Sequence, residues 1–360
     1  MKVIQNCSLF LALVCICLST AGLEAKTKVI KVSPRQDLAA LVRSARANTA
    51  FLLAPGTYRL KSQEPHQQGV LLENKSNVSI IGKNRDATRI ELPAGMKFGF
   101  YIGSNLSRVT LQGFTISGTP PLKENTHAIG NYSGSTGNKG LHFTNLRIEK
   151  VAVGNSLATA VSGDYEDVLV DRNLIGPTLG AEAGWGYGIH LENVKGVTIA
   201  ENLIRECTRH SIYLARAARD SKIMVRRNLI LNHDAAAAQP RWYCSALTCA
   251  RSSGVTIAGN LIVRPRTIAI SVEPDEYMGW PTENVSLLSN RILSSRRVGI
   301  WVTTGGSCTA LANRVSLDPS PPDPQWCREL STYDYARGKE TGSTIAAATL
   351  NFLQDSGSRS

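Results

Sequence analysis

The sequence predicts an all-β fold: a right-handed, single-stranded parallel β-helix (a β-solenoid) with a short capping helix at its N-terminal end. The first observation is an Asn-Leu-Ile triplet at 173–175, 202–204, 228–230 and 260–262, with looser copies beginning at Asn145, Asn290 and Asn313. Successive Asn residues are 28, 29, 26, 32, 30 and 23 residues apart. Self-similarity at such a period is typical of a solenoid whose repeats stack on one another.

The second observation is a short strand pattern shortly before each triplet, in which apolar residues alternate with others. Alternation with a period of two indicates a half-buried β-strand. We interpret the Asn that follows as a turn residue, because Asn tolerates left-handed dihedral angles. Stacked Asn side chains are also expected to hydrogen-bond as a ladder. The strand copies are Val78-Ser79-Ile80, Val109-Thr110-Leu111, Leu141-His142-Phe143, Val168-Leu169-Val170, Val197-Thr198-Ile199, Ile223-Met224-Val225, Val255-Thr256-Ile257 and Val285-Ser286-Leu287.

The third observation is another apolar strand within each repeat, and three short strands per repeat complete one coil of the β-helix. The long stretch between Ile212 and Ile270 is expected to hold an irregular rung near residues 243–247. The copies are Phe100-Tyr101-Ile102, Val161-Ser162, Ile189-His190-Leu191, Ile212-Tyr213-Leu214, Ile270-Ser271-Val272 and Ile300-Trp301-Val302.

The two ends of the chain differ from the repeats. Residues 1–25 read as a signal peptide, with a basic start, an apolar run from Leu9 to Leu18 and small residues after it. That run is too short to span a bilayer, so we expect a secreted or periplasmic protein without a membrane span. Residues 26–315 are expected to form the β-helix catalytic domain, and residues 316–360 a C-terminal cap and disordered tail.

A short amphipathic helix is expected at 37–45, with Asp37 as its N-cap. A solenoid exposes an open strand edge at each end, and this helix is placed to cover the N-terminal one.

The formal charge of +12 narrows the classes of molecule that this protein is expected to bind. Nucleic-acid motifs are absent from the sequence, and an exported basic protein attracts polyanions, so an acidic polysaccharide is the expected partner. The oligomeric state stays open. Of the cysteines outside the signal peptide, Cys244 with Cys249 and Cys308 with Cys327 are the favoured local disulfides, and Cys207 reads as a buried free thiol.

Several motifs then carry a resemblance. Pro55-Gly56-Thr57-Tyr58, the Gly-Ile-x-Leu pattern beginning at Gly188 and the Asn-x-Ile repeats resemble the pectate-lyase-like β-helix superfamily over residues 29–315. The resemblance implies the fold more strongly than the reaction, because this scaffold hosts lyases, hydrolases, epimerases and non-catalytic adhesins.

The third strand indicates where a site would lie. With Ile189 and Leu191 inward, His190 and Glu192 point outward, and Tyr213 stands one rung away, roughly 4.8 Å along the axis. Loops beside this face bring aromatic and Arg side chains that suit sugar stacking and carboxylate binding. The substrate-binding candidates are Tyr187, Trp185, Glu192, Arg241, Trp242, Ser271 and Trp301.

The catalytic candidates are His190, Tyr213, His210 and Arg216. The C5 proton of a uronic acid becomes acidic when its carboxylate is neutralised, a role that suits Arg216. His190 or Tyr213 is the candidate base, and Tyr213 or His210 the candidate acid for the leaving oxygen. A Tyr base needs a lowered pKa, which neighbouring cations would favour.

A second resemblance concerns Tyr187-Gly188-Ile189, followed a rung later by His210-Ser211-Ile212, which is similar to the β-helical mannuronan C5-epimerases. Those enzymes carry a catalytic Asp-Pro-His-Asp after the first motif, where this chain has His190-Leu191-Glu192-Asn193. The resemblance implies the substrate class and the groove, and the departure puts the epimerase machinery in doubt.

These observations favour a secreted polysaccharide lyase that cleaves a uronic-acid polymer by β-elimination. The alternatives are a C5-epimerase of a uronan such as alginate and a non-catalytic carbohydrate-binding solenoid. Hydrolysis needs paired carboxylates, and Glu192 and Glu273 are at least two rungs apart. No cofactor is expected; the outward column is poor in acids, so Ca²⁺ stays open but is not implied.

Overall fold

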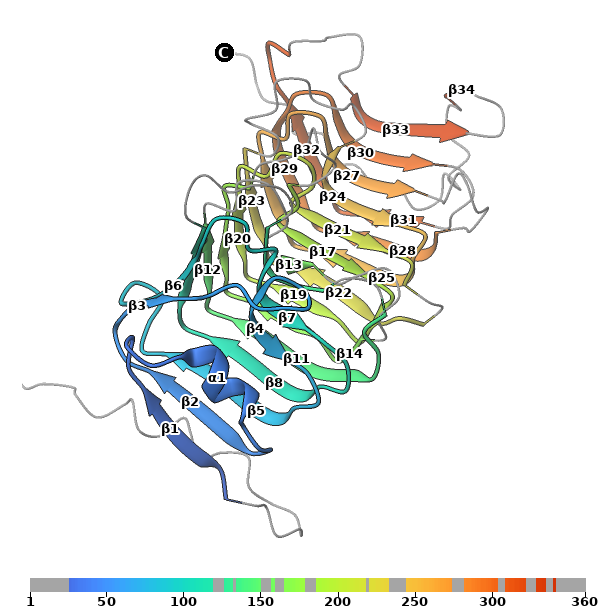
Figure 1. Cartoon of the computed structure of the whole chain (residues 1–360). Helices are drawn as coiled ribbons and strands as arrows, with labels where there is room; N and C mark the ends of the chain where they lie inside the picture. Colours follow the sequence, from blue (N-terminus) through green and yellow to red (C-terminus); the bar gives the residue numbers. More distant parts are fainter. Residues whose placement is uncertain are drawn as a thin grey trace, which may run out of the picture.

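The computed structural model of this chain describes residues 26–118, 126–131, 134–149, 157–158, 165–178, 186–217, 220–232, 244–273, 282–303, 308–321, 328–334 and 339–340. Short strands stack into a parallel β-helix along one axis, from the N-terminal end to the C-terminal end (Figure 1). Successive rungs follow the chain, so each strand pairs with the strand one coil later.

Three sheets form the walls of the solenoid, and we name them A, B and C. Sheet A contains β1 (Lys28–Val32), β2 (Thr49–Leu53), β5 (Ser76–Gly82), β8 (Ser107–Gln112), β11 (Asn138–Thr144), β15 (Leu169–Asp171), β19 (Thr198–Ala200), β22 (Ile223–Arg226), β25 (Ser253–Ala258), β28 (Glu283–Leu288) and β31 (Cys308–Leu311). In addition, β14 (Tyr165–Glu166) pairs with β11, and β18 (Val194–Lys195) pairs with β14.

Sheet B follows sheet A after a tight turn and carries the Leu-Ile pairs of the repeated triplets. It contains β3 (Gly56–Arg59), β6 (Thr88–Leu92), β9 (Thr115–Gly118), β12 (Arg147–Glu149), β16 (Leu174–Ile175), β20 (Leu203–Arg205), β23 (Leu229–Leu231), β26 (Leu261–Val263), β29 (Arg291–Ser295) and β32 (Arg314–Leu317).

Sheet C is the third wall. It contains β4 (Gln68–Leu72), β7 (Phe98–Ile102), β10 (His127–Gly130), β13 (Leu157–Ala158), β17 (Ile189–Glu192), β21 (Ile212–Ala215), β24 (Ser245–Ala250), β27 (Ile268–Glu273), β30 (Val298–Thr303), β33 (Arg328–Asp334) and β34 (Lys339–Glu340). The predicted irregular rung is wrong, because β24 pairs in regular register with β21 and β27.

The core is the inside of the coil. Most of the described strands contribute buried apolar residues to it, such as the fully buried Ile189, Ile199 and Ile204. Burying a side chain of that size stabilises the fold by about 1.5–3 kcal/mol. The rungs nearest the N-terminus use larger rings, among them Phe51, Phe100 and Phe114, and the core is continuous from Val32 to Ala310.

The predicted Asn ladder is confirmed at the turn between sheets A and B. Nδ2 of Asn173, Asn202, Asn228, Asn260 and Asn290 donates to Oδ1 of the next Asn at 2.9–3.0 Å, and the ladder ends at Asn313. The ladder residues are all buried. Each Nδ2 also donates to a strand carbonyl, as Asn228 does to Ile199 at 3.0 Å.

The ladder Asn does not supply the left-handed turn, contrary to the sequence expectation. The residue just before it does: φ is 57° at Glu201, 54° at Arg227 and 61° at Gly259. The physical reason is that each Asn must aim its amide along the axis, so the preceding residue makes the bend. Asn145, a loose sequence copy, is one such bend residue with φ 50°, and Leu146 stands at the ladder position.

The two ends of the described solenoid are closed differently. Helix α1 (Leu38–Arg43) lies at the N-terminal end (Figure 1), and Leu38 and Val42 join the core. Asp37 is its N-cap and accepts a hydrogen bond from the Ala40 amide at 3.0 Å. At the other end, parallel pairing continues beyond residue 315 through β33, and the antiparallel strand β34 ends it.

The cysteine pattern differs from the favoured pairing. Cys244 and Cys249 are both buried and form no disulfide with each other. Five residues of extended strand separate them by about 16 Å, well beyond disulfide reach. Cys207 is a buried free thiol as predicted, and burial raises its pKa to about 11. Cys327 and residues 1–25 lie outside the described residues. Within the described residues, no helix has the length and apolarity to cross a membrane.

Candidate functional site

The outward face of sheet C aligns the predicted residues in one column. His190 on β17 pairs with Tyr213 on β21, which pairs with Thr248 on β24. Ser271 and Trp301 continue the column on β27 and β30. The alternation that places these side chains outward buries Ile189 and Leu191 fully in the core, so the hydrophobic pattern of the strand sets the direction of the site residues.

Four aromatic rings form a cluster on this face. Tyr187 stacks on His190 with ring centroids 4.5 Å apart and on His210 at 5.3 Å. The Tyr213 ring lies 5.0 Å from both His190 and His210. The Arg209 guanidinium lies 4.9 Å from the Tyr187 ring centroid, a cation–π contact that the sequence analysis missed. The structure therefore brings three of the four predicted catalytic residues together.

The fourth catalytic candidate joins this cluster through a carboxylate. Oε1 of Glu192 lies 2.7 Å from Nε2 of His190, and its Oε2 lies 3.3 Å from Nη1 of Arg216. Burial raises the pKa of Glu192, but the hydrogen bond from His190 and the charges of His190, Arg216 and Arg251 outweigh it, so the pKa is lowered. Glu192, predicted to contact substrate, is instead 9% exposed and holds His190 and Arg216 in place.

His210 is anchored from the next rung. Its Nδ1 lies 2.9 Å from the Thr248 hydroxyl and 3.0 Å from the Ser245 carbonyl oxygen, and the ring is buried. The sequence analysis missed Thr248. Its neighbours Leu247 and Cys249 are apolar and point inward, and this alternation is the signal that places Thr248 in the outward column.

The phenols in the cluster are held protonated. Burial raises the pKa of Tyr213 to about 12, the negative charges of Glu192 and Glu273 add to the rise, and Arg251 and Arg209 only partly oppose it. Burial also raises the pKa of Tyr187. The expected lowering for a Tyr base is therefore wrong: the two carboxylates and the desolvation outweigh the neighbouring cations. Tyr213 is suited to donate a proton.

The remaining substrate-binding candidates are not gathered at the cluster. Ser271 lies two rungs beyond Tyr213, is fully buried and donates to Oε1 of Glu273. Trp301, a rung further, is 6% exposed. Neither side chain offers an open contact surface. Trp185, Arg241 and Trp242 lie outside the described residues.

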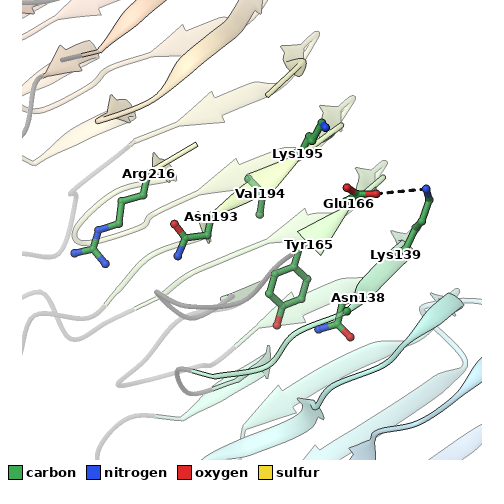
Figure 2. A pocket seen from close by; sticks show the side chains of 9 residues that line it. Asn138, Lys139, Tyr165, Glu166, Asn193, Val194, Lys195 and Arg216 are labelled. Carbon is green, nitrogen blue, oxygen red and sulfur yellow. Dashed lines mark hydrogen bonds and ion pairs between the residues drawn. The ribbon is translucent and has the colours of Figure 1, made fainter. Parts of the chain in front are cut away.

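A groove of about 540 Å³ opens beside the cluster, where sheet C turns into sheet A (Figure 2). Arg216 lines this groove and also contacts Glu192, so it connects the groove to the cluster. The groove has the size of a small-molecule site. Its other lining residues include Lys139, Tyr165, Glu166, Asn193 and Lys195.

Among the residues that the structure describes, no three His, Cys, Asp or Glu side chains group closely enough to hold a metal ion.

Comparisons with known proteins address the fold. A family profile described as a right handed beta helix region matches residues 59–315. An alginate lyase from Paenibacillus sp. is 14% identical with a TM-score of 0.53, over 85% of this chain and 98% of its own. The A-module of a mannuronan C-5 epimerase from Azotobacter vinelandii is 13% identical with a TM-score of 0.48, over 83% of this chain and 88% of its own. A surface protein and adhesin of Streptococcus pneumoniae is 10% identical with a TM-score of 0.44, over 79% of this chain and 91% of its own. No curated protein sequence matches this chain.

Proposed function

The chain belongs to the right-handed β-helix family, and we propose that it is a polysaccharide lyase that cleaves a uronic-acid polymer by β-elimination. The observation that carries the proposal is the arrangement around His190. An imidazole bound to an ionised carboxylate stands one rung from a protonated phenol, with an Arg at the edge. A base, an acid and a cation are the groups that this elimination needs.

The base is His190. The ionised Glu192 carboxylate can only accept a hydrogen bond, so Nε2 of His190 carries a proton, and in the neutral form of the ring the lone pair is on Nδ1. Nδ1 takes the C5 proton, and the electrons of the C5–H bond form the C4–C5 double bond. Arg216 neutralises the uronate carboxylate and thereby makes that proton more acidic.

The acid is Tyr213. Its raised pKa of about 12 keeps the hydroxyl protonated at neutral pH. As the C4–O4 bond breaks, the phenol donates its proton to the leaving oxygen, and the imidazolium of His190 then restores the phenol. The ring centroids of the two residues are 5.0 Å apart, which suits such a return through a bound water.

Hydrolysis is less well supported by the carboxylates. Glu192 and Glu273 are three rungs apart in register, about 14 Å along the axis. Glycosidase carboxylates lie roughly 5–9.5 Å apart. The pair is too widely separated for that chemistry.

The test monitors the formation of unsaturated uronate by its ultraviolet absorbance. The substrates are alginate, polygalacturonate, glucuronan and glycosaminoglycans. Rising absorbance on one polymer is expected, and His190→Ala or Tyr213→Phe should lower the rate by about 10²-fold or more. The matched controls are His142→Ala, on the outer face of sheet A, and Tyr101→Phe, three rungs earlier in the same column. Full activity in both site variants contradicts the assignment.

A C5-epimerase is the second candidate, because it begins with the same proton abstraction and the same base serves it. If no polymer yields absorbance, deuterium incorporation at C5 in D₂O identifies epimerisation. Polymer binding with neither signal identifies a non-catalytic carbohydrate-binding protein.

A further inference from the structure

A column of alternating charge lines the groove beside the cluster. Lys139 on β11, Glu166 on β14 and Lys195 on β18 are paired in register on three successive rungs. Asn138, Tyr165 and Val194 form the neighbouring column, and all three are buried. The groove therefore has a buried floor and a charged rim. Figure 2 shows the side chains of both columns.

The rim carries more positive than negative charge. Nζ of Lys139 lies 3.4 Å from Glu166 and 3.6 Å from Asp167, so the acids of this rim are engaged by one lysine. Lys195 is exposed, and within the described part of the chain it has no ion-pair partner. Arg216 adds a second cation on the next rung.

Arg216 lies between this rim and the groups proposed to react, because it lines the groove and also contacts Glu192. Its Nη1 contacts Glu192 at 3.3 Å, yet the side chain is only partly buried and lines the groove. A guanidinium has five N–H donors, so it can donate to Glu192 and to a second carboxylate at the same time. From Lys139 to Arg216 the groove spans three inter-rung steps, about 14 Å, which is longer than one sugar ring.

We propose that this groove is a carboxylate-binding subsite that holds a second uronate unit of the polymer beside the unit at His190. Lys195 is its principal cation, Arg216 connects it to the reacting unit, and Glu166 weakens it by occupying Lys139. This inference rests on the proposed function for the identity of the polymer. It specifies a substrate that carries acidic groups on neighbouring units.

Binding tests the subsite without requiring turnover. Dissociation constants for alginate and polygalacturonate oligosaccharides are measured in a His190→Ala background, with a neutral dextran oligosaccharide as the comparison ligand. Lys195→Gln should weaken acidic-oligosaccharide binding about fivefold at low salt, and added salt should shrink the difference.

The opposite effect on acidic-oligosaccharide binding is expected for Glu166, one rung before Lys195. Glu166→Gln removes one of the two carboxylates that engage Lys139, with Asp167 remaining, and should tighten binding about twofold to threefold. Lys31→Gln, an exposed lysine on β1 far from the groove, is the matched control and should leave the dissociation constant unchanged. A general loss of net charge would affect Lys31→Gln and Lys195→Gln equally.

The outcomes separate the two proposals. Binding that weakens in Lys195→Gln and tightens in Glu166→Gln supports the subsite, even if no unsaturated product forms and the lyase proposal fails. Acidic-oligosaccharide binding that neither substitution alters overturns the subsite and leaves the lyase proposal standing. If the His190→Ala protein binds neither acidic oligosaccharide, or binds dextran equally well, the subsite is overturned too.

Discussion

Nε2 of His190 lies 2.7 Å from Oε1 of Glu192, two residues along the same strand and on the same outward face. Because the pKa of Glu192 is lowered, the carboxylate is ionised at neutral pH and fixes the proton on Nε2. In the proposed lyase Glu192 would act through His190 as a positioning residue, and Arg216 contacts its second oxygen.

Replacing Glu192 with Gln should lower kcat about 10²-fold with a smaller change in KM. A Gln amide can donate to Nε2 and so favours the wrong tautomer. Steady-state kinetics on the polymer that gives the strongest signal measure both constants. Glu91→Gln, which removes a paired carboxylate from sheet B, is the control and should keep wild-type kcat. A KM increase at constant kcat would assign Glu192 to substrate binding instead.

The raised pKa of Tyr213 predicts how the free energy of unfolding changes at alkaline pH. Its folded pKa is about 12 against an ordinary value of 10.0, so the folded state keeps a proton that the unfolded state has lost. The sign follows from linkage: this contribution is present below pH 10 and is lost as pH rises toward 12. Urea unfolding of Tyr213→Phe should therefore show a smaller loss of stability over that range than wild type. Equal losses in the two proteins would mean that the buried phenol does not contribute.

The Asn ladder should be most sensitive in its middle. Asn228→Ala removes Nδ2 donations to Asn260 and Ile199, and it takes the acceptor from the amide and side chain of Asn202. Leaving buried polar groups without partners costs about 1–3 kcal/mol for each group, so thermal unfolding should shift to clearly lower temperature. Asn313→Ala, at the last rung, breaks fewer bonds and should cost less. Equal shifts would argue against cooperation along the ladder.

The left-handed bend before each ladder Asn predicts a glycine effect. Gly259 has φ +61°, and a Cβ added there meets no atom within 4 Å. Gly259→Ala should thus cost about 1 kcal/mol from backbone conformation alone. Gly259→Asn should cost less, because Asn tolerates this region. Denaturation curves of the three proteins measure the order, and a larger loss for Asn than for Ala would contradict it.

Sequence periodicity accounts for most of the fold. The spacing of Asn-Leu-Ile gives the rungs, and the alternation in strands such as β17 gives the inward and outward faces, because a strand period of two leaves no other register that buries Ile189 and Leu191. The same alternation predicts that His190 and Tyr213 share one column, and the two residues are paired in register on β17 and β21. Local chemistry also identified the N-cap at Asp37.

The tertiary structure alone decided the features that depend on neighbours from other rungs. The residue before each ladder Asn makes the bend because the Asn side chain has to point along the solenoid axis. Strand β24 is regular because it pairs with β21 on one side and with β27 on the other. The roles of Glu192 and Tyr213 follow from burial and from charges far apart in the chain, such as Arg251 and Glu273. Periodicity determines which face a side chain occupies, whereas its partner and its protonation state are set by the summed field of residues that only stacking brings together.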